Sequence, residues 1–483
     1  MLDFMQRKVK IICTLGPSSY DEVIIEDLIK SGMNIARLNF SHGDHGFYRI
    51  LINRIRHAAA KLGVPVAILQ DLQGPKIRVG KMPESGVELQ DGQHVFISID
   101  EMIGSSQQFY TPYAAIINDV DVNDPILLDD GKISLVCEKK ESRRLFCRVE
   151  QGGVLKSNKG INLPHSATST PSLSSKDIRD LNFGAHAGVD AVALSFVRSA
   201  QDVIKLRAEL ASTKTRPLII AKLEKQQAID DLENILRVSD GVMVARGDLG
   251  VEMPAENVPL VQKRIIERAL AHGKTAVVAT EMLESMITQV RPTRAEASDV
   301  ANAVLDGTDM LMLSAETAAG AHPIKAVSMM SKIARHVEES NRASYWRTSR
   351  LVLQQEKRDI QNTMCLGAVQ ACEVLKASAI VMFSNSGMTA RMVSAYRPQK
   401  PIIAFVPDAI VQRTLAFSWG VRAFVLKAPE RSMELFASIN KQLLETGEFQ
   451  VGERVIVLTK IPLRSKEHTN TVHVHTLKSV LSH

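Results

Sequence analysis

Short apolar runs alternate with helical patterns along most of the chain. Leu218 to Leu223 is apolar except for Lys222, and Gly241 to Ala245 is apolar throughout. Between these runs, Gln226 to Val238 carries apolar residues at helical spacing, so we expect one helix there. Strands that are apolar on both faces are typical of parallel sheets covered by helices. This stretch therefore predicts a strand, a helix and a second strand of a parallel sheet.

The same alternation recurs along the chain and predicts a (β/α)8 barrel. Helices are expected between the strands, for example at Asn257 to Ala271 and at Thr293 to Leu305. Eight strand–helix units are typical of a TIM barrel. The predicted strands are Val9–Thr14, Met33–Leu38, Val66–Gln70, Ala191–Ser195, Leu218–Leu223, Gly241–Ala245, Ala276–Ala279 and Met310–Leu313.

Two regions depart from this pattern. From Val79 to Asn162, short alternating runs separated by turn residues predict an all-β domain without helices, inserted after the third strand. Beyond a predicted helix at Pro323 to Glu339, a polar stretch, 339–358, is interpreted as a linker into an open α/β sheet. The strands predicted for that sheet are Ala379–Phe383, Pro401–Val406, Arg454–Thr459 and Thr471–His475.

The sequence therefore predicts an α/β protein of three domains. The barrel is expected over 1–73 and 165–342, an inserted β-barrel lid domain over 74–164, and a C-terminal α/β domain over 343–483. Composition agrees with a globular chain, since 45% of residues are hydrophobic and 23% are charged.

Composition also excludes several classes of function. Aromatic residues make up 5% of the chain and the net charge is only +6, without a long basic run, so we expect no nucleic acid partner. No apolar run approaches the ~20 residues that span a bilayer, so no membrane contact is expected. The five cysteines lack metal-binding spacing, which favours a reduced, cytoplasmic protein.

Charged and hydroxyl side chains stand where the predicted barrel strands end, which in a TIM barrel is the catalytic face. Two carboxylates beside several cations suit Mg²⁺ shared with phosphate oxygens, and phosphoryl transfer relies on Lys, Arg and Mg²⁺. Each residue alone could be a structural ion pair or a helix cap, but their common position indicates an active site for an anion and a metal. The residues are Arg37, Asp71, Lys222, Glu224, Arg246, Asp248, Thr280, Ser314 and Glu316, with Gly247 leaving room for a ligand.

Several motifs resemble those of pyruvate kinases. They occur in the family's order, cover nearly the whole chain and are highly specific when taken together. The segments are Arg37–Gly43, Asp71–Arg78, Ile220–Glu224, Val244–Glu252, Ala279–Met286, Arg291–Glu296 and Ser314–Ala318. The resemblance implies Mg²⁺-dependent transfer of a phosphoryl group from phosphoenolpyruvate to ADP, giving pyruvate and ATP, with Mn²⁺ as a possible substitute for Mg²⁺.

The resemblance also implies a role for each matching residue. Glu224 and Asp248 would bind Mg²⁺, while Lys222 and Arg37 would contact the transferred phosphoryl group. The substrate carboxylate would lie at Gly247, Asp248 and Thr280, and Thr280 and Ser314 would protonate the enolate through a hydroxyl–water relay. The lid domain would close over the site and exclude water. The positions that match the nucleotide site are Asn39, His42, Arg78 and Lys159.

One departure concerns the monovalent cation. Asn39, Ser41 and Asp71 match the K⁺ site of the family. The residues that follow, Leu72-Gln73-Gly74-Pro75-Lys76, resemble instead the sub-group that does not need K⁺. Our hypothesis is that the Lys76 ammonium supplies the positive charge that K⁺ would provide. Glu281 also replaces a Gln that is usual in the family.

The C-terminal domain resembles the family's regulatory domain. Ser384, Asn385, Ser386 and Thr389 match a loop that binds the phosphate of an allosteric effector, in front of a predicted helix. Met388 replaces a common Arg, and the later loop, Ile461 to Asn470, lacks the glycines of members regulated by fructose-1,6-bisphosphate. A sugar monophosphate or AMP is therefore expected as effector, with an inert loop as the alternative. By the same resemblance the chain would form a homotetramer.

Two rival functions remain open at this point. The first is a Mg²⁺-dependent aldolase or lyase that stabilises an enolate on a barrel, which would have less need of Lys222 and no need of a nucleotide lid. The second is a non-catalytic allosteric binding protein, which would be expected to carry a damaged site. Turnover of phosphoenolpyruvate with ADP separates both from a kinase.

Overall fold

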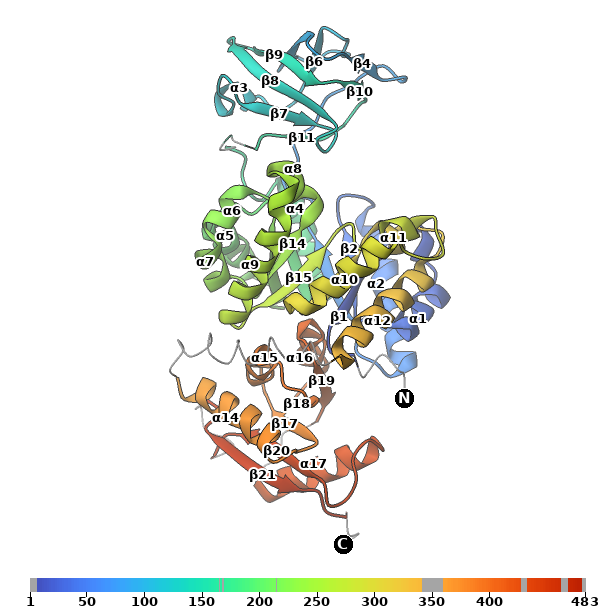
Figure 1. Cartoon of the computed structure of the whole chain (residues 1–483), viewed down its shortest axis with the longest axis vertical. Helices are drawn as coiled ribbons and strands as arrows, with labels where there is room; N and C mark the ends of the chain where they lie inside the picture. The colour runs from blue at the N-terminus through green and yellow to red at the C-terminus, as the bar shows by residue number, and fades with distance from the viewer. Residues whose placement is uncertain are drawn as a thin grey trace.

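The computed structural model describes residues 7–164, 166, 169–213, 215–340, 359–426, 432–461 and 468–479. Figure 1 shows three bodies stacked along the long axis, with an all-β domain above a barrel and an α/β domain below it. Of the predicted linker at 339–358, residues 341–358 lie outside the described residues. The predicted fold class is confirmed.

The central body is a closed barrel of eight parallel strands in the order β1-β16-β15-β14-β13-β12-β3-β2. Six of its strands are buried along their whole length, and the register places Asn39 at the end of one strand opposite Asp71 at the end of the next. The strands are β1 (Lys10–Thr14), β2 (Ile35–Asn39), β3 (Ala67–Asp71), β12 (Ala191–Leu194), β13 (Leu218–Leu223), β14 (Gly241–Ala245), β15 (Thr275–Ala279) and β16 (Met310–Leu313).

Helices surround the barrel, and capping residues in the local sequence set where they begin and end. The Asp44 side chain accepts a hydrogen bond from Phe47 N at the start of α2, which ends at Gly63 in a left-handed conformation (φ 66°). The helices are α1 (Glu22–Ser31), α2 (His45–Leu62), α4 (Ser175–Ala187), α5 (Ala200–Leu210), α6 (Gln226–Asp230), α7 (Leu232–Val238), α8 (Arg246–Glu252), α9 (Val258–Ala271), α10 (Arg294–Asp306), α11 (Ala315–Ala318) and α12 (Pro323–Glu339).

The prediction of one continuous helix after β13 is wrong. The structure has two helices, α6 and α7, separated at Asp231. The Asp231 carboxylate accepts hydrogen bonds from Ala200 N, at the start of α5, and from the Asn234 side chain. Asp231, which the apolar spacing places inside one helix, thus lies between two helices and contacts a third.

The lid domain consists of a six-stranded sheet, β11-β7-β8-β9-β5-β6, and a two-stranded ribbon, β10-β4. Its apolar core is separate from that of the barrel. The expectation of no helix is wrong in one place, because Ile116–Asp119 forms the short helix α3. The strands are β4 (Val87–Leu89), β5 (His94–Ser98), β6 (Gln108–Tyr110), β7 (Pro125–Leu128), β8 (Ile133–Lys140), β9 (Arg144–Gln151), β10 (Gly153–Leu155) and β11 (Ile161–Asn162).

The C-terminal domain is an open sheet, β19-β18-β17-β20-β21, whose last strand is antiparallel. Strand β19 is absent from the sequence prediction because Arg422 interrupts its apolar run and its last residue is exposed. The strands are β17 (Ala379–Phe383), β18 (Ile402–Val406), β19 (Val421–Val425), β20 (Arg454–Thr459) and β21 (Thr471–Thr476), with helices α14 (Ile360–Val374), α15 (Met388–Ala395), α16 (Ala409–Thr414) and α17 (Ser432–Glu445).

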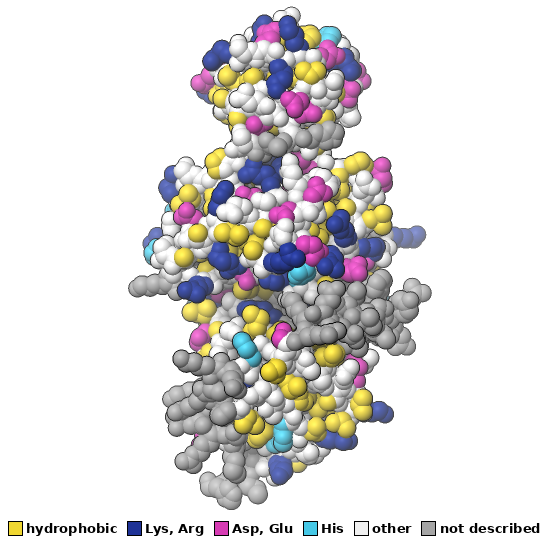
Figure 2. All heavy atoms as spheres, turned by 90° about the vertical axis from the view of Figure 1, so that its left-hand side faces the viewer, with side chains coloured by type: hydrophobic (Ala, Val, Ile, Leu, Met, Phe, Trp, Pro, Cys, Tyr) yellow, Lys and Arg dark blue, Asp and Glu magenta, His cyan; other side chains and the backbone are white. Residues whose placement is uncertain are grey.

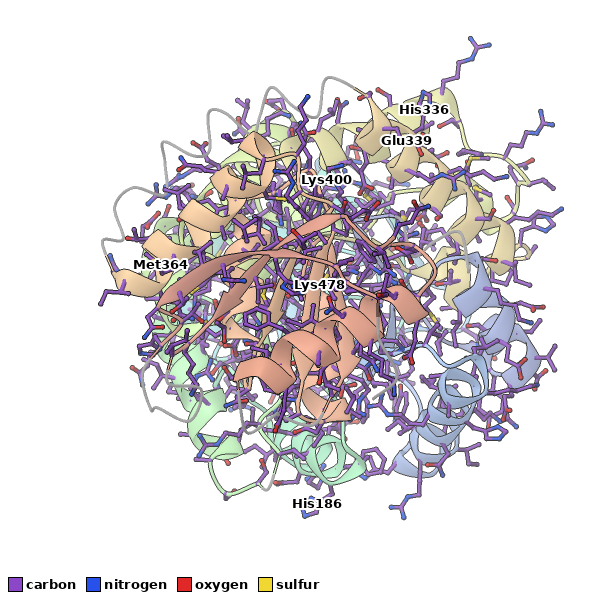
Figure 3. All side chains as sticks on the ribbon, turned by 90° about the horizontal axis from the view of Figure 1, so that it is seen from below. His186, His336, Glu339, Met364, Lys400 and Lys478 are labelled. Atoms are coloured by element: carbon purple, nitrogen blue, oxygen red, sulfur yellow. The ribbon has the colours of Figure 1, made fainter. Side chains whose placement is uncertain are left out.

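This domain closes the lower end of the barrel. Phe417 is fully buried and packs with Ile12, Met310 and other side chains of the barrel interior. Figure 3, seen from below, shows the sheet lying across that end, with Lys478 in front of it and Met364 of α14 to one side. The barrel and the C-terminal domain therefore share part of one apolar core.

The outer surface carries both signs of charge. Figure 2 shows Lys and Arg side chains intermixed with Asp and Glu over the described parts of one face, and a narrow neck between the lid and the barrel. Within the described ranges, no helix is long and apolar enough to cross a membrane.

Candidate active site

The upper rim of the barrel collects the polar side chains that the sequence singled out. Each of them lies in the last three residues of a barrel strand or within three residues after it. In parallel strands these ends lie at one edge, which is why residues far apart in sequence meet there. The set comprises Arg37, Asp71, Lys222, Glu224, Arg246, Asp248, Thr280, Ser314 and Glu316.

Asp71 is the centre of a buried ion-pair cluster. Its side chain is 1% exposed, and Arg37 Nε and Nη2 both lie 2.7 Å from its Oδ2. Lys222 Nζ lies 3.5 Å from its Oδ1. Burial acts to raise the pKa of Asp71, but Lys222 and Arg37 outweigh it, so the pKa lies below its ordinary value. The carboxylate therefore remains ionised and orients both cations.

Lys222 connects this cluster to the second carboxylate. Its Nζ lies 2.8 Å from Glu224 Oε1, and it also donates to Ser195 Oγ at 2.8 Å. Burial acts to lower the pKa of Lys222, but Asp71, Glu224 and Asp248 outweigh it and raise the pKa above its ordinary value. Lys222 is thus a permanently charged, nearly buried ammonium rather than the solvated lysine common at strand ends.

Glu224 and Asp248 are the pair that could hold a divalent cation. Burial raises the pKa of Glu224, and the charge of Asp248 adds to this effect, while Lys222 opposes it. Glu224 Oε2 also accepts a hydrogen bond of 2.6 Å from Phe196 N. Mg²⁺ binds carboxylate oxygens and would relieve the repulsion between these two carboxylates. No group of three or more potential metal ligands lies within the described ranges, so substrate or water oxygens would complete the coordination.

Thr280 lies beside the start of α8. Gly247 N donates to Thr280 Oγ1 at 2.8 Å, and that hydroxyl donates to Ala279 O at 2.6 Å. The Thr280 backbone is left-handed, with φ 70°, a conformation that costs a β-branched residue about 1–3 kcal/mol. The surrounding contacts must therefore stabilise this conformation.

Ser314 and Glu316 follow β16. The Glu316 carboxylate is buried and accepts hydrogen bonds from Ser314 N at 2.7 Å and from Leu283 N at 3.1 Å. Glu316 therefore fixes the backbone around Ser314. This role resembles the helix cap that its position in the sequence suggested. Thr14, at the end of the neighbouring strand β1, accepts a hydrogen bond at its Oγ1 from Arg37 Nη1 at 2.9 Å.

The residues matched to the nucleotide site lie on two domains. Asn39 and His42 belong to the barrel, where Tyr48 OH lies within hydrogen-bond distance of both of their carbonyl groups. Arg78 and Lys159 belong to the lid, where Arg78 Nη1 donates to Asn158 O at 2.9 Å and Lys159 Nζ lies 2.8 Å from Asp129 Oδ1.

Lys76 lies at the junction of the lid and the barrel. Its ammonium is 3.8 Å from Asp130 Oδ1 of the lid. A small cavity of about 30 Å³ separates Lys76 from Asp248, with Arg198 and Lys225 also lining it. Of the residues matched to the K⁺ site, Ser41 donates its backbone N–H to Asn39 Oδ1 at 3.2 Å.

Four residues near the site were not predicted from the sequence. Ser195 links Lys222 to the Leu72 carbonyl, to which its hydroxyl donates at 2.7 Å. Lys225 Nζ lies 2.9 Å from Glu252 Oε1, and Asn162 of the lid donates to the same oxygen at 3.0 Å. The position of Ser195 at a strand end was a usable signal, whereas the contact between Glu252 and the lid left no trace in the sequence.

In the C-terminal domain, the loop of the predicted effector site precedes α15. Asn385 and Ser386 are exposed, while Ser384 and Thr389 are buried. Thr389 Oγ1 lies 2.9 Å from Thr469 Oγ1 and accepts a hydrogen bond from the Gln361 side chain at 3.1 Å.

Comparison with known proteins identifies the family. A model of the pyruvate kinase barrel domain matches residues 6–327, and a model of the pyruvate kinase alpha/beta domain matches residues 362–475. A pyruvate kinase of Mycobacterium tuberculosis (strain ATCC 25618 / H37Rv) is 42% identical over 476 residues, which is 98% of each chain.

Another pyruvate kinase, from Corynebacterium efficiens, is 43% identical over 477 residues and 98% of each chain. A crystal structure of a pyruvate kinase from Cryptosporidium parvum superposes with a TM-score of 0.93 at 34% identity, covering 98% of this chain and 97% of that one. The chain therefore belongs to the pyruvate kinase family, phosphotransferases that act on phosphoenolpyruvate and ADP and form pyruvate and ATP.

Proposed function

We propose that phosphoryl transfer takes place at the buried cluster of Asp71, Lys222 and Glu224. The observation that carries this proposal is the Lys222 ammonium, which has 11% of its side chain exposed and lies between two carboxylates at 3.5 and 2.8 Å. A fixed cation in a poorly solvated site neutralises the charge on a phosphoryl group more strongly than one in water. Arg37, oriented by Asp71, would bind the same group.

Glu224 and Asp248 would hold Mg²⁺, and Mn²⁺ would suit the same oxygen ligands. The raised pKa of Glu224 supports this assignment, because a cation would relieve the repulsion that raises it. The bound metal would neutralise and orient phosphate oxygens. Gly247, Asp248 and Thr280 would bind the substrate carboxylate, and Thr280 with Ser314 would deliver a proton from water to the enolate.

The nucleotide would lie between the barrel and the lid. Asn39 and His42 would contact it from below, and Arg78 and Lys159 from the lid, so binding would favour closure. Closure would exclude water and protect the phosphoryl group from hydrolysis. Support comes from the position of these four residues on two domains joined by a narrow neck (Figure 2).

The need for K⁺ is a separate question. Asn39, Ser41 and Asp71 would form the K⁺ site in other members of the family, and Lys76 would replace the ion here, as Leu72 and Gln73 also suggest. In the described position the ammonium faces Asp130 rather than Asp71. The hypothesis therefore requires lid closure to bring Lys76 toward Asp71.

Several organisational features belong to the same proposal. The domains would divide at residues 73/74, 164/165 and 342/343, and the protein would be a cytoplasmic homotetramer. Five buried free cysteines support a reducing compartment. A sugar phosphate or AMP would bind at Ser384, Asn385, Ser386 and Thr389, for which the exposed tip of the loop in front of α15 is the support.

A coupled assay of pyruvate formation tests the central claim. Wild type and Lys222→Met are assayed with Mg²⁺, phosphoenolpyruvate and ADP, with or without K⁺ at constant ionic strength. We expect Lys222→Met to lose about 100- to 1000-fold in kcat. Lys132→Met, in a side chain that is 73% exposed on the lid, is the matched control.

An inactive wild type would overturn the proposal. Pyruvate formation without ADP would mean that the phosphoryl group passes to water, which contradicts a kinase, and binding without turnover would favour a non-catalytic protein. Activity that collapses when K⁺ is omitted would contradict only the hypothesis on Lys76.

A further inference from the structure

The turn after β15 has an unusual backbone. Thr280 and Glu281 are consecutive non-glycine residues with left-handed conformations, φ 70° and φ 54°. Such conformations persist only when their surroundings impose them, and a β-branched residue is among the least suited to them. The chain uses no glycine at either position, so the turn depends on contacts from elsewhere.

Those contacts come from Arg246. Its Nη2 lies 2.7 Å from Thr280 O and 3.0 Å from Glu281 O, and its Nε lies 3.2 Å from Thr280 O. Its Nη1 donates to Asp299 Oδ2 of α10 at 2.6 Å. Only 11% of the Arg246 side chain is exposed. One guanidinium thus holds both carbonyl groups of the turn while Asp299 fixes the guanidinium.

The same contacts determine where the Thr280 hydroxyl lies. Arg246 is the first residue of α8, and the next residue, Gly247, donates its N–H to Thr280 Oγ1 at 2.8 Å. The main chain and the side chain of one segment therefore contact both ends of Thr280. If the guanidinium were absent, the turn would relax and the hydroxyl would leave its position beside Gly247.

We propose that Arg246 is a positioning residue that holds the strained Thr280–Glu281 turn, and with it the Thr280 hydroxyl, in place for the proton-transfer step. The inference rests on the proposed role of Thr280. In that step the methylene carbon of the enolate gains a proton, an O–H bond of the hydroxyl–water relay breaks, and solvent replaces the lost proton. No electron is transferred. Arg246 itself touches no reacting atom.

The planar fork of arginine is essential to this arrangement. Lysine keeps the positive charge but has a single nitrogen, so it cannot contact both carbonyl groups and Asp299 with the same geometry. Arg246→Lys therefore removes the forked contacts while it keeps the positive charge. A purely structural ion pair between Arg246 and Asp299 would largely tolerate this change.

Exchange of the methyl protons of pyruvate with solvent isolates the proton step. Pyruvate is incubated in D₂O with Mg²⁺, ATP and enzyme, and loss of the methyl signal is followed by NMR. We expect Arg246→Lys to slow exchange about 10- to 100-fold, while the KM for ADP and the thermal midpoint stay near wild type. Asp299→Asn should slow exchange less. Arg237→Lys, at an exposed arginine of α7 whose side chain donates to Asn234, is the matched control.

A rescue variant distinguishes positioning from general damage. Glycine adopts a left-handed backbone conformation without steric cost. Adding Glu281→Gly to Arg246→Lys should therefore raise the exchange rate at least threefold above that of Arg246→Lys alone. A damaged fold would gain nothing from this glycine.

Exchange in Arg246→Lys within twofold of wild type would overturn the inference. So would losses of exchange, ADP affinity and stability that run in parallel and are not rescued. Absence of exchange in wild type would instead overturn the proposed role of Thr280, and this inference with it. The two failures are therefore distinguishable.

Discussion

The two ends of the barrel both contain buried charges, but the charges are arranged differently. At the lower end, Asp190 accepts hydrogen bonds from Ile68 N, Arg56 and Arg413, and every contact is between 2.7 and 2.8 Å. At the upper end, Glu224 lies near a second carboxylate and has a raised pKa. The fold thus supplies partners to both oxygens of Asp190, whereas the pKa of Glu224 stays raised even though Lys222 contacts it.

This difference matches the use of the two ends. The lower contacts join the barrel to the C-terminal domain, as Arg397 does when its Nη1 lies 2.9 Å from Asp309 Oδ1. At the upper end, Asp248 lines a cavity at the junction of the lid and the barrel. In TIM barrels the lower face serves stability and the upper face serves catalysis. Buried charge alone therefore does not mark an active site, whereas two neighbouring carboxylates that raise the pKa of Glu224 distinguish the upper end.

The largest effect is expected at the lower end. Arg397→Met leaves Asp309 buried without its cation, and breaking such a pair typically costs 3–5 kcal/mol in the free energy of unfolding. The turnover number per folded molecule should change less than threefold. Urea denaturation and a coupled assay would measure the two effects. Lys400→Met, at an exposed position in the same domain, is the control (Figure 3). A loss of turnover without a loss of stability would contradict the division between the two ends.

The next largest effect is expected at the upper end. Glu224→Gln removes one of the two carboxylates, so the Mg²⁺ concentration for half-maximal activity should rise about 10- to 100-fold. Stability should be retained or improved, because a repulsive buried charge is lost. Titration of activity with Mg²⁺, together with thermal unfolding, tests this expectation. An unchanged Mg²⁺ requirement would show that Glu224 is not a metal ligand.

The pH dependence of Mg²⁺ binding tests the same difference between the two ends of the barrel. Because burial and Asp248 raise the pKa of Glu224, protons compete with Mg²⁺ as the pH falls toward that pKa, and Mg²⁺ binding weakens by up to about tenfold per pH unit. Above that pKa, binding should become independent of pH. Asp71 does not add to the effect, since its pKa is lowered. Mg²⁺ titrations between pH 5 and 8 would measure the slope, and Glu224→Gln should abolish it.

The smallest effect is expected for charges that are not buried. Arg143 contacts Asp100 on the lid, where their side chains are 62% and 51% exposed. Solvent screening makes such pairs worth about 0–1 kcal/mol, so Arg143→Met should leave both stability and turnover close to wild type. The same urea and activity measurements apply. A large loss here would mean that the lid is more sensitive to surface charge than the barrel.

The candidate site could be predicted where local sequence and strand ends coincide. Lys222 and Glu224 follow directly from an apolar run that ends in charge. Ser195 stands at an equivalent strand end, yet a hydroxyl gives no charge signal, and its contact with Lys222 became visible only in the folded barrel. The division of one predicted helix at Asp231 was hidden for a similar reason, because its partner Ala200 belongs to another helix.

By itself, the sequence determined the barrel, the inserted lid, the C-terminal sheet and the residues at the strand ends. These follow from hydrophobic period and from the order of segments, which are local properties. Only the tertiary structure decided that Arg246 reaches a strained turn in the next strand–helix unit, that Phe417 enters the barrel interior, and that burial and Asp248 raise the pKa of Glu224. Those features depend on distances between residues far apart in the chain, and such distances exist only after the strands close into a barrel.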